Sequence, residues 1–275
     1  MNLQVITGEK IQQLADIYIG TDDDFNYNPV IFNQSHKHCN IHRLTTAYDN
    51  PRIIFCYSHN INLFSEKIQF FNNKFVLLSH NSDGNIIDTE QVQKILNCTN
   101  LLTWYAQNLH IVHPKLHYLP IGFANSMWKH SNLDFFTNDE IFNITKSKRI
   151  YFNFNVNTSY EKRISCYNSL KNKLPFLAFL EPNDNLSRLN DYEFCICPEG
   201  NGADTHRLWE CLYLKVVPIV INSQFTKVLN KYNIPMVILE KWDDFDDTLL
   251  NYTDYNFSNL NIYLSDFEKM IKNTV

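Results

Sequence analysis

The segment from Phe194 to Asn222 constrains the fold more than any other part of the chain. It reads FCICPEGNGADTHRLWECLYLKVVPIVIN and sets an apolar strand, a glycine-containing loop, a helix and a second apolar strand end to end. Two of the chain's six glycines, Gly200 and Gly202, lie in this loop. A strand–helix–strand unit with glycine in its first turn presents backbone N–H groups and a helix N-terminus to a phosphate. The segment therefore predicts a site for a nucleotide or a phosphorylated sugar.

Strands and helices alternate along the rest of the chain. The pattern predicts strands at 52–58, 74–79, 115–122, 149–155, 193–197, 216–221 and 236–240. Helices are predicted at 8–17, 61–71, 88–97, 137–146, 159–172, 204–215, 225–231 and 257–273. Such alternation is typical of α/β folds with parallel sheets. We therefore expect two Rossmann-like, doubly wound domains that face a cleft, at 1–147 and 148–275, with the last helix able to pack back on the first domain.

Composition narrows the classes of function. The 275 residues are 44% hydrophobic and 19% charged, which is ordinary for a soluble globular protein. The net charge of −5 argues against a nucleic-acid binder, which usually has a basic surplus. The N-terminus lacks the pattern of a signal peptide, and no run approaches the roughly 20 apolar residues that cross a bilayer. We expect a cytoplasmic chain without a membrane span, or a domain of a larger protein.

Polar residues at the start of the motif helix define the predicted binding site. Asp204 is predicted to be the N-cap, which places Thr205 and His206 in the first turn. Arg207, in the same turn, has a guanidinium that matches phosphate geometry. Glu210 follows at i+3 on the same face, where its carboxylate can accept hydrogen bonds from a ribose. The alternative is a surface Arg207–Glu210 pair of little energetic value; the glycine loop before the helix favours the ligand site.

The pattern CPEGNGADTHRLWECLYLKVVPIVI resembles the donor-binding segment of exostosin-like glycosyltransferases, which have the two-domain GT-B fold. The shared features are a strand ending in a Pro-x-Gly turn, an arginine-bearing helix, an acidic residue one turn later and a Pro-Ile/Val strand. The stretch at 214–217 departs from the small residues often found before that proline. The resemblance implies that Arg207 holds the donor diphosphate, Glu210 the ribose, and that four residues line the loop: Glu199, Gly200, Asn201 and Gly202.

The same resemblance implies an enzyme that transfers a sugar from a nucleotide-sugar, such as a UDP-sugar or GDP-sugar, to a hydroxyl of a glycan or glycoprotein. Transfer would be inverting and independent of a metal or other cofactor, because arginine and helix N–H groups can neutralise the leaving diphosphate. One alternative is a catalytically inactive module of the same fold that binds a nucleotide or glycan. A kinase or phosphatase is disfavoured, since the chain has no G-x4-GK[ST] loop and no clear paired-carboxylate metal site.

Two strands of the predicted first domain end in Ser-His-Asn, at 58–60 and 79–81. In open α/β sheets the ligand crevice lies at the carboxyl ends of the strands. A histidine there can take a proton from an acceptor hydroxyl at neutral pH. We expect His80 to be this base, with Asp83 as the alternative base or its orienting partner. The competing interpretation is a turn in which Asn81, Asp83 and Gly84 only satisfy backbone groups.

Further candidates are expected near the cleft. Arg163, in the helix at 159–172, is either a second phosphate ligand or a solvated helix residue. Trp128 either stacks on a sugar or packs in the core. Asn81, after the strand at 74–79, is a predicted cleft contact, and those after the strand at 115–122 are Gly122, Asn125, Trp128 and His130.

Two groups of metal-capable residues are predicted not to bind a metal. The densest comprises His36, His38, Cys39 and His42, but zinc sites usually combine ligands from two separated segments and this is one. Cys195 and Cys197 alternate along a buried strand and point to the same side, so we expect them to pack in the core.

Overall fold

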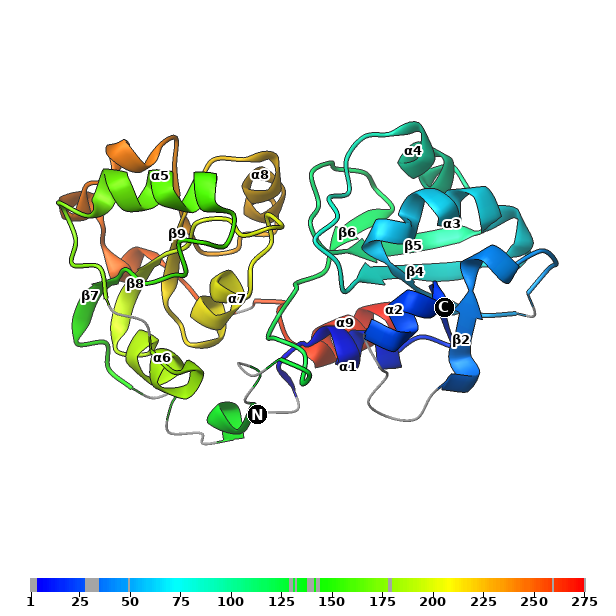
Figure 1. The fold of residues 1–275 in the computed structure, drawn as a ribbon, viewed down its shortest axis with the longest axis horizontal. Helices are drawn as coiled ribbons and strands as arrows, with labels where there is room; N and C mark the ends of the chain where they lie inside the picture. Colours follow the sequence, from blue (N-terminus) through cyan, green and yellow to red (C-terminus); the bar gives the residue numbers. More distant parts are fainter. Residues whose placement is uncertain are drawn as a thin grey trace. The chain divides into compact units, whose positions relative to one another are not determined.

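The computed structural model describes residues 4–27, 35–48, 50–128, 131, 133–137, 141, 144–177, 180–258 and 260–274. They form an α/β fold with one parallel sheet of six strands and a second parallel sheet of four (Figure 1). The chain divides into two compact units. The six-strand unit comprises Ile6–Ile121 and Asn261–Val275, and the four-strand unit comprises Met1–Val5 and Gly122–Leu260.

The six-strand sheet has the order β2-β1-β3-β4-β5-β6, and all of its neighbouring strands are parallel. Its strands are β1 (Ile17–Gly20), β2 (His38–Asn40), β3 (Ile53–Tyr57), β4 (Phe75–His80), β5 (Leu101–Ala106) and β6 (Leu116–Tyr118). Because β2 lies on one side of β1 and β3 on the other, the direction of winding reverses between β1 and β3. A reversal of this kind is a topological switch point.

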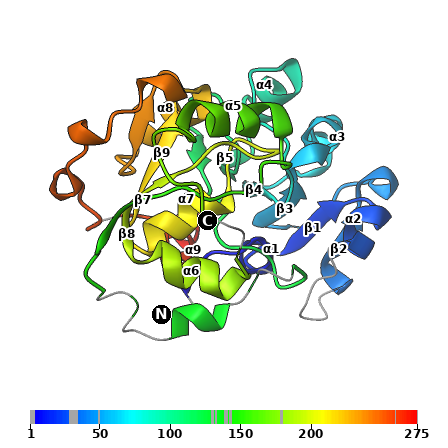
Figure 2. The same ribbon diagram turned by 60° about the vertical axis from the view of Figure 1, so that its left-hand side comes forward.

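Helices cover both faces of this sheet. They are α1 (Gly8–Gln13), α2 (Asp22–Tyr27), α3 (Ile61–Lys67), α4 (Glu90–Leu96) and α9 (Leu264–Lys272). The helices α3 and α4 lie on one face, and α1 and α9 lie on the other (Figures 1 and 2). The ring of Phe267 in α9 meets Tyr105 and Tyr118 edge-on, with centroids 6.2 and 5.9 Å away. The last helix thus packs on the first sheet, as the sequence analysis allowed.

The four-strand sheet has the order β10-β9-β8-β7 and is also parallel. Its strands are β7 (Lys148–Tyr151), β8 (Tyr192–Ile196), β9 (Val217–Ile221) and β10 (Val237–Leu239). Its helices are α5 (Tyr160–Leu170), α6 (Pro182–Leu189), α7 (His206–Tyr213) and α8 (Gln224–Asn230). The segment from β8 through α7 to β9 is the strand–helix–strand unit that the central motif predicted.

The alternation of side chains along the strands divides the core of this unit into two layers. Phe194 and Ile196 of β8 pack with Cys166 and Leu170 of α5 in one buried cluster. Cys195, the residue between them, lies on the opposite face with α7. The motif helix and α5 therefore cover opposite faces of one sheet (Figure 2).

Several elements differ from the sequence-based prediction. The strands β1, β2 and β5 and the helices α2 and α6 were not predicted. The first helix ends at Gln13 rather than at 17, and the last begins at Leu264 rather than at 257. Of the predicted helix at 137–146, residues 144–146 are not helical and 138–140, 142 and 143 lie outside the described residues. By contacts, residues 122–147 belong to the four-strand unit, whereas the predicted border was at 147/148.

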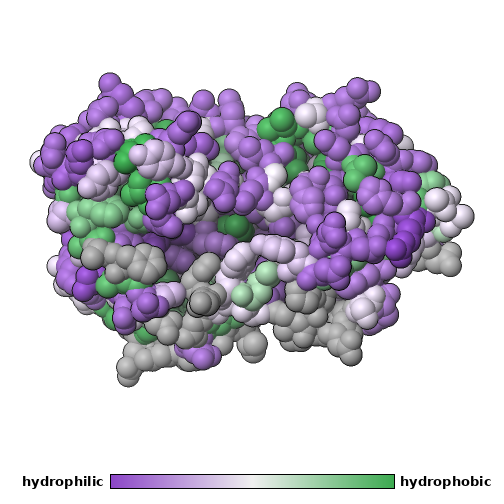
Figure 3. All heavy atoms as spheres, in the orientation of Figure 1, coloured by the Kyte–Doolittle hydropathy of each residue, from purple (hydrophilic) through white to green (hydrophobic). Residues whose placement is uncertain are grey.

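Hydrophilic residues predominate on the face drawn in Figure 3, where hydrophobic residues form only small groups. The exposed large hydrophobic residues are spread along the described sequence; Met127 and Trp128 are the adjacent pair, at 39% and 42% exposure. None of the helices in the described ranges combines the length and apolar character needed to cross a bilayer.

Candidate functional site

The motif loop leads from β8 into α7, whose N-cap is Thr205. The Thr205 side chain makes no capping hydrogen bond, so no side-chain cap satisfies the amides of the first turn. The prediction that Asp204 is the N-cap is wrong. The helix begins one residue later, and the buried Asp204 carboxylate accepts a hydrogen bond of 2.5 Å from the Trp209 indole instead. An uncapped helix start of this kind favours a negative group beside it.

Arg207 is fixed by three contacts within the four-strand unit. Its Nε donates to Glu210 Oε2 at 3.0 Å and its Nη1 donates to the Asn153 carbonyl at 2.8 Å. Its guanidinium lies 5.5 Å from the centroid of the Tyr151 ring. The Arg207 and Glu210 side chains are only 17% and 12% exposed, so this is not the solvated surface pair of the alternative interpretation.

Burial acts to lower the pKa of Arg207, but the Glu210 carboxylate, together with smaller contributions from Cys195, Cys211 and Tyr151, raises the pKa above its ordinary value. The guanidinium is therefore a permanent positive charge. Because protein contacts hold it in place, it loses little additional freedom when it binds a ligand.

Arg163 of α5 supplies a second guanidinium next to the motif loop. Its Nε donates to the Glu199 carbonyl at 3.0 Å and its Nη1 donates to the Asn155 carbonyl at 2.9 Å. Burial, and then the charge of Arg207, lower the pKa of Arg163 to about 10. The two guanidiniums are thus close enough to repel each other. Glu210 is the one carboxylate in the described ranges that forms an ion pair with either of them, and a bound anion would relieve the repulsion.

The glycine loop is shaped by these contacts. Lys162 and Glu199 form an ion pair of 2.6 Å at its outer side. A Cβ on Gly200 would lie 3.3 Å from Nη2 of Arg163, a distance tighter than most side-chain contacts. The Gly200 amide also donates to the Gly202 carbonyl at 3.1 Å, which closes the turn. Asn201, at its tip, is exposed.

The predicted contact residue Gly122 is brought to the start of α7. The His206 Nδ1 lies 2.9 Å from the Gly122 carbonyl, which can only accept, so Nδ1 carries the proton. Gly122 has φ of 68°, a backbone conformation that residues other than glycine rarely adopt.

The turn that follows is closed by a bond of 3.0 Å from the Trp128 amide to the Asn125 carbonyl. Trp128 is 42% exposed, so it is partly covered by the protein and partly open to solvent. The predicted contact His130 lies outside the described residues.

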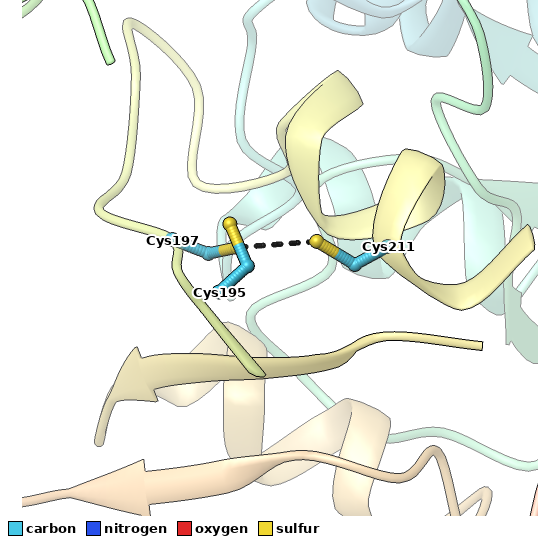
Figure 4. Close-up of side chains that lie close together, drawn as sticks. All are labelled: Cys195, Cys197 and Cys211. Carbon is cyan, nitrogen blue, oxygen red and sulfur yellow. Dashed lines mark hydrogen bonds between the residues drawn. The ribbon is translucent and has the colours of Figure 1, made fainter. Parts of the chain in front are cut away.

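Three cysteine thiols lie beneath the motif helix, between β8 and α7 (Figure 4). The sulfur atoms of Cys195, Cys197 and Cys211 all lie within 4.8 Å of one another, and those of Cys197 and Cys211 are 3.7 Å apart. In the described ranges they form the group best placed to hold a soft metal ion. Burial raises the pKa of Cys197 and Cys211; it acts in the same direction on Cys195, but there the hydrogen bonds from Cys197 and Cys211 and the charge of Arg207 outweigh it and lower the pKa. All three side chains are buried, in agreement with the core position predicted for Cys195 and Cys197.

The one-segment group of His36, His38, Cys39 and His42 is dispersed over η2 (Ser35–Lys37), β2 and η3 (Ile41–Arg43). The His38 ring stacks on Phe25, with centroids 4.0 Å apart. Burial, and then the charge of His36, lower the pKa of His38. His42 is exposed, whereas Nε2 of His38 is buried without a hydrogen-bond partner among the described residues.

His80 ends β4 at the carboxyl edge of the six-strand sheet, as predicted, but its side chain is buried at 1% exposure. Its Nε2 lies 2.9 Å from the Pro120 carbonyl and its Nδ1 lies 3.1 Å from Oδ1 of Asn81. Both ring nitrogens are therefore engaged within the protein. His80 can act as a base only in a conformation that exposes this ring. Asp83, three residues later, is exposed.

A histidine–carboxylate pair that the sequence analysis missed lies at the same edge. His59, after β3, places Nε2 at 2.7 Å from Oδ1 of Asp24, which follows β1. The sequence indicated the strand end before His59, but Asp24 lay in a stretch for which no strand was predicted. The sequence signal for Asp24 is the short apolar run IYIG at 17–20, which is followed directly by the turn-forming residues TDDD at 21–24.

Comparison of the chain with protein-family models and with characterised proteins finds no match.

Proposed function

We propose that this chain is a glycosyltransferase with a GT-B arrangement, which transfers a sugar from a nucleotide-sugar to a hydroxyl of a glycan or glycoprotein. The observation that carries the proposal is the pair of guanidiniums, Arg163 and Arg207, held by protein carbonyls beside a glycine loop and the start of α7. Two guanidiniums that donate to the carbonyls of Asn155 and Asn153, two residues apart, are suited to a ligand with two adjacent negative groups.

In the proposed reaction, the acceptor oxygen forms a bond to the anomeric carbon of the sugar while the bond from that carbon to the diphosphate oxygen breaks. The nucleoside diphosphate leaves with the electrons of that bond. Arg207 and Arg163 would neutralise the charge that develops on it, which is the role that fixed cationic groups have in phosphate-leaving reactions. Attack opposite to the leaving group would invert the anomeric configuration.

Glu210 would bind the ribose of the donor through its second oxygen. Its Oε2 accepts from Arg207, whereas Oε1 receives no hydrogen bond from the part of the chain that the structure describes. The exposed Asn201 and the half-buried Thr205 would contact the phosphates or the sugar.

The first test is calorimetric titration with UDP, GDP and CMP. The wild type is expected to bind one of them with micromolar affinity. Arg207→Lys, which keeps the charge but loses the fork, should bind at least tenfold more weakly, or about 1.4 kcal/mol. Arg188→Ala, which removes an exposed arginine of the same unit, is the matched control and should bind as the wild type does. Failure of the wild type to bind any of the three contradicts the proposed donor site.

A second candidate is a non-catalytic module of the same fold, and the burial of His80 is the observation that favours it. The module would bind the nucleotide with the same arginine dependence but would not consume a nucleotide-sugar. Release of nucleoside diphosphate from UDP-glucose, UDP-galactose, UDP-N-acetylglucosamine, GDP-mannose and GDP-fucose distinguishes the two. Turnover of one of them supports the enzyme, and binding without turnover supports the module.

A further inference from the structure

The three thiols between β8 and α7 come from two separate segments of the chain. Cys195 lies in β8, Cys197 directly follows this strand, and Cys211 lies in α7. Sites for thiophilic metals usually combine ligands from two such segments, and the two strand cysteines alone do not meet this condition. The strand–helix unit therefore brings together a ligand set that neither segment contains by itself (Figure 4).

The spacing of the sulfur atoms is close to that of ligands around one metal ion. Metal–sulfur bonds of about 2.3 Å, as in zinc sites, place trigonal or tetrahedral sulfur ligands roughly 3.8–4.0 Å apart. The sulfur atoms of Cys197 and Cys211 are 3.7 Å apart, and that of Cys195 lies within 4.8 Å of both. Bringing Cys195 into the same triangle thus needs a shift of at most about 1 Å.

The backbone holds the three ligands in place without an ion. The strand that carries Cys195 is hydrogen-bonded to β7 on one side and to β9 on the other. The Cys197 amide donates to the Ile219 carbonyl at 2.9 Å. The Cys211 carbonyl accepts from the Val216 amide at 2.8 Å. Because these bonds fix the positions of the ligands, little conformational freedom remains to be lost when an ion binds.

Two guanidiniums lie near enough to the cluster to favour negative charge on it. Arg207 interacts electrostatically with Cys195 and Cys211, and Arg163 interacts with Cys197. Three thiolates around a monovalent ion carry a net negative charge, and burying such a charge without compensation is costly. The guanidiniums supply part of that compensation.

Buried thiols can also be small packing residues with no ligand. Cys166 is an example in the same unit, because it lies in the apolar cluster on the other face of the sheet, with Phe194 and Leu170. The three cysteines beneath α7 differ from it, since their sulfur atoms converge on one another. All seven cysteines of the chain are free, so the cluster is not used for a disulfide.

The number and type of ligands indicate which ion fits. Thiolates favour monovalent copper, zinc and iron–sulfur clusters. Zinc in structural sites and iron–sulfur clusters use four protein ligands. In the part of the chain that the structure describes, no fourth cysteine, histidine or carboxylate joins the group. Monovalent copper, which three sulfur ligands satisfy, is the ion of this set that matches.

We propose that Cys195, Cys197 and Cys211 bind one monovalent copper ion as three thiolates. Each thiol releases its proton to solvent as its sulfur atom bonds to the ion, and the copper remains monovalent throughout, so no oxidant or reductant is needed. The bound ion joins the end of β8 to the helix that carries Arg207 and Glu210. This inference does not depend on the proposed glycosyl transfer.

The first test is competition for Cu(I) between the reduced full chain and the chromogenic chelator bicinchoninate, without oxygen. The wild type should withdraw one equivalent of copper from the chelator. X-ray absorption at the copper edge should then show three sulfur neighbours. A wild type that withdraws no copper, or that holds it through two sulfur atoms or through nitrogen, refutes the three-thiolate site.

Single substitutions identify the ligands. Cys195→Ser, Cys197→Ser and Cys211→Ser should each weaken copper binding at least about 100-fold, which is the upper end of what losing a mere supporting contact costs. Cys166→Ser is the matched control, because it removes a buried thiol of the same unit outside the group, and it should bind as the wild type does. Wild-type affinity in any of the three variants, or an equal loss in the control, overturns the assignment.

Two further measurements keep the inference testable if a variant does not fold, which circular dichroism establishes. Copper should raise the thermal midpoint of the wild type, because the unfolded chain does not hold the three ligands together; an unchanged midpoint contradicts a site in the folded unit. An equal amount of zinc should leave the copper bound. Displacement of copper by zinc overturns the choice of ion.

Discussion

Replacing Arg207 is expected to destabilise the protein through the carboxylate that it leaves behind. Arg207→Ala would strand Glu210, 12% exposed, without its ion-pair partner. Breaking a buried pair in this way costs about 3–5 kcal/mol, and the remaining exposure of both groups places the cost near 3 kcal/mol. Adding Glu210→Gln removes the stranded charge. The double variant should then lose only about 1–2 kcal/mol, from the bond to the Asn153 carbonyl and the contact with Tyr151.

Urea unfolding followed by circular dichroism measures these differences, provided that the m-values of the wild type, Arg207→Ala, Glu210→Gln and the double variant agree. The second substitution should restore stability: the free energy of unfolding of the double variant should exceed that of Arg207→Ala by about 1–2 kcal/mol. If the double variant is as unstable as the single one, the charge of Glu210 is not compensated by Arg207 and the reasoning about the pair is refuted. The cycle also gives a folded protein without the guanidinium for nucleotide titration.

Three further predictions concern other contacts. Ser79→Ala removes the 2.8 Å partner of the buried Trp104 indole and should cost about 1–3 kcal/mol in urea unfolding; no loss would mean that this bond is not made. Gly122→Ala places a side chain at φ of 68° and should cost about 1–2 kcal/mol, with a lower thermal midpoint; an unchanged midpoint would contradict the left-handed backbone. Burial acts to raise the pKa of Asp24, but the hydrogen bonds that it accepts outweigh it and lower the pKa. A lowered pKa stabilises the folded state above the ordinary carboxyl pKa near 4, and this contribution is lost as pH falls through the folded value. The stability difference between wild type and Asp24→Asn should therefore shrink below about pH 4, and a constant difference would contradict the assignment.

The parts of the fold with strong local patterns were predictable. Buried strands such as β8 and β9, joined by a helix with one apolar face, carry their periodicity in a short window. The first helix shows where such reasoning fails. Ile11, Leu14 and Ile17 have helical spacing, but the helix ends at Gln13, and Ile17 is buried because it belongs to β1.

The turn before β1 is fixed by a contact that the local pattern does not contain. The Asp16 carboxylate accepts from the amides of Arg52 and Ile53 at 2.8 and 2.9 Å, which ties it to the neighbouring strand. Because that contact joins segments far apart in the sequence, no short window predicts it.

Only part of the candidate site was predictable, because some of its contacts join segments that are far apart in the sequence. The proximity of Arg207 and Glu210 follows from one turn of helix, whereas the repulsion between Arg163 and Arg207 depends on how α5 and α7 pack around the sheet. The burial of His80 and the contact of His59 with Asp24 likewise depend on neighbouring strands. Strand ends were identified from the sequence, but the accessibility of their side chains was not.

The central claim is that two guanidiniums form a site for a diphosphate, and its most direct measurement compares a nucleoside diphosphate with the corresponding monophosphate. Calorimetry on the wild type should show that UDP or GDP binds at least tenfold more tightly than UMP or GMP, about 1.4 kcal/mol. In Arg163→Ala this difference should largely disappear, while the affinity for the monophosphate changes less. Equal affinities for diphosphate and monophosphate in the wild type, or an unchanged difference in Arg163→Ala, would contradict the account.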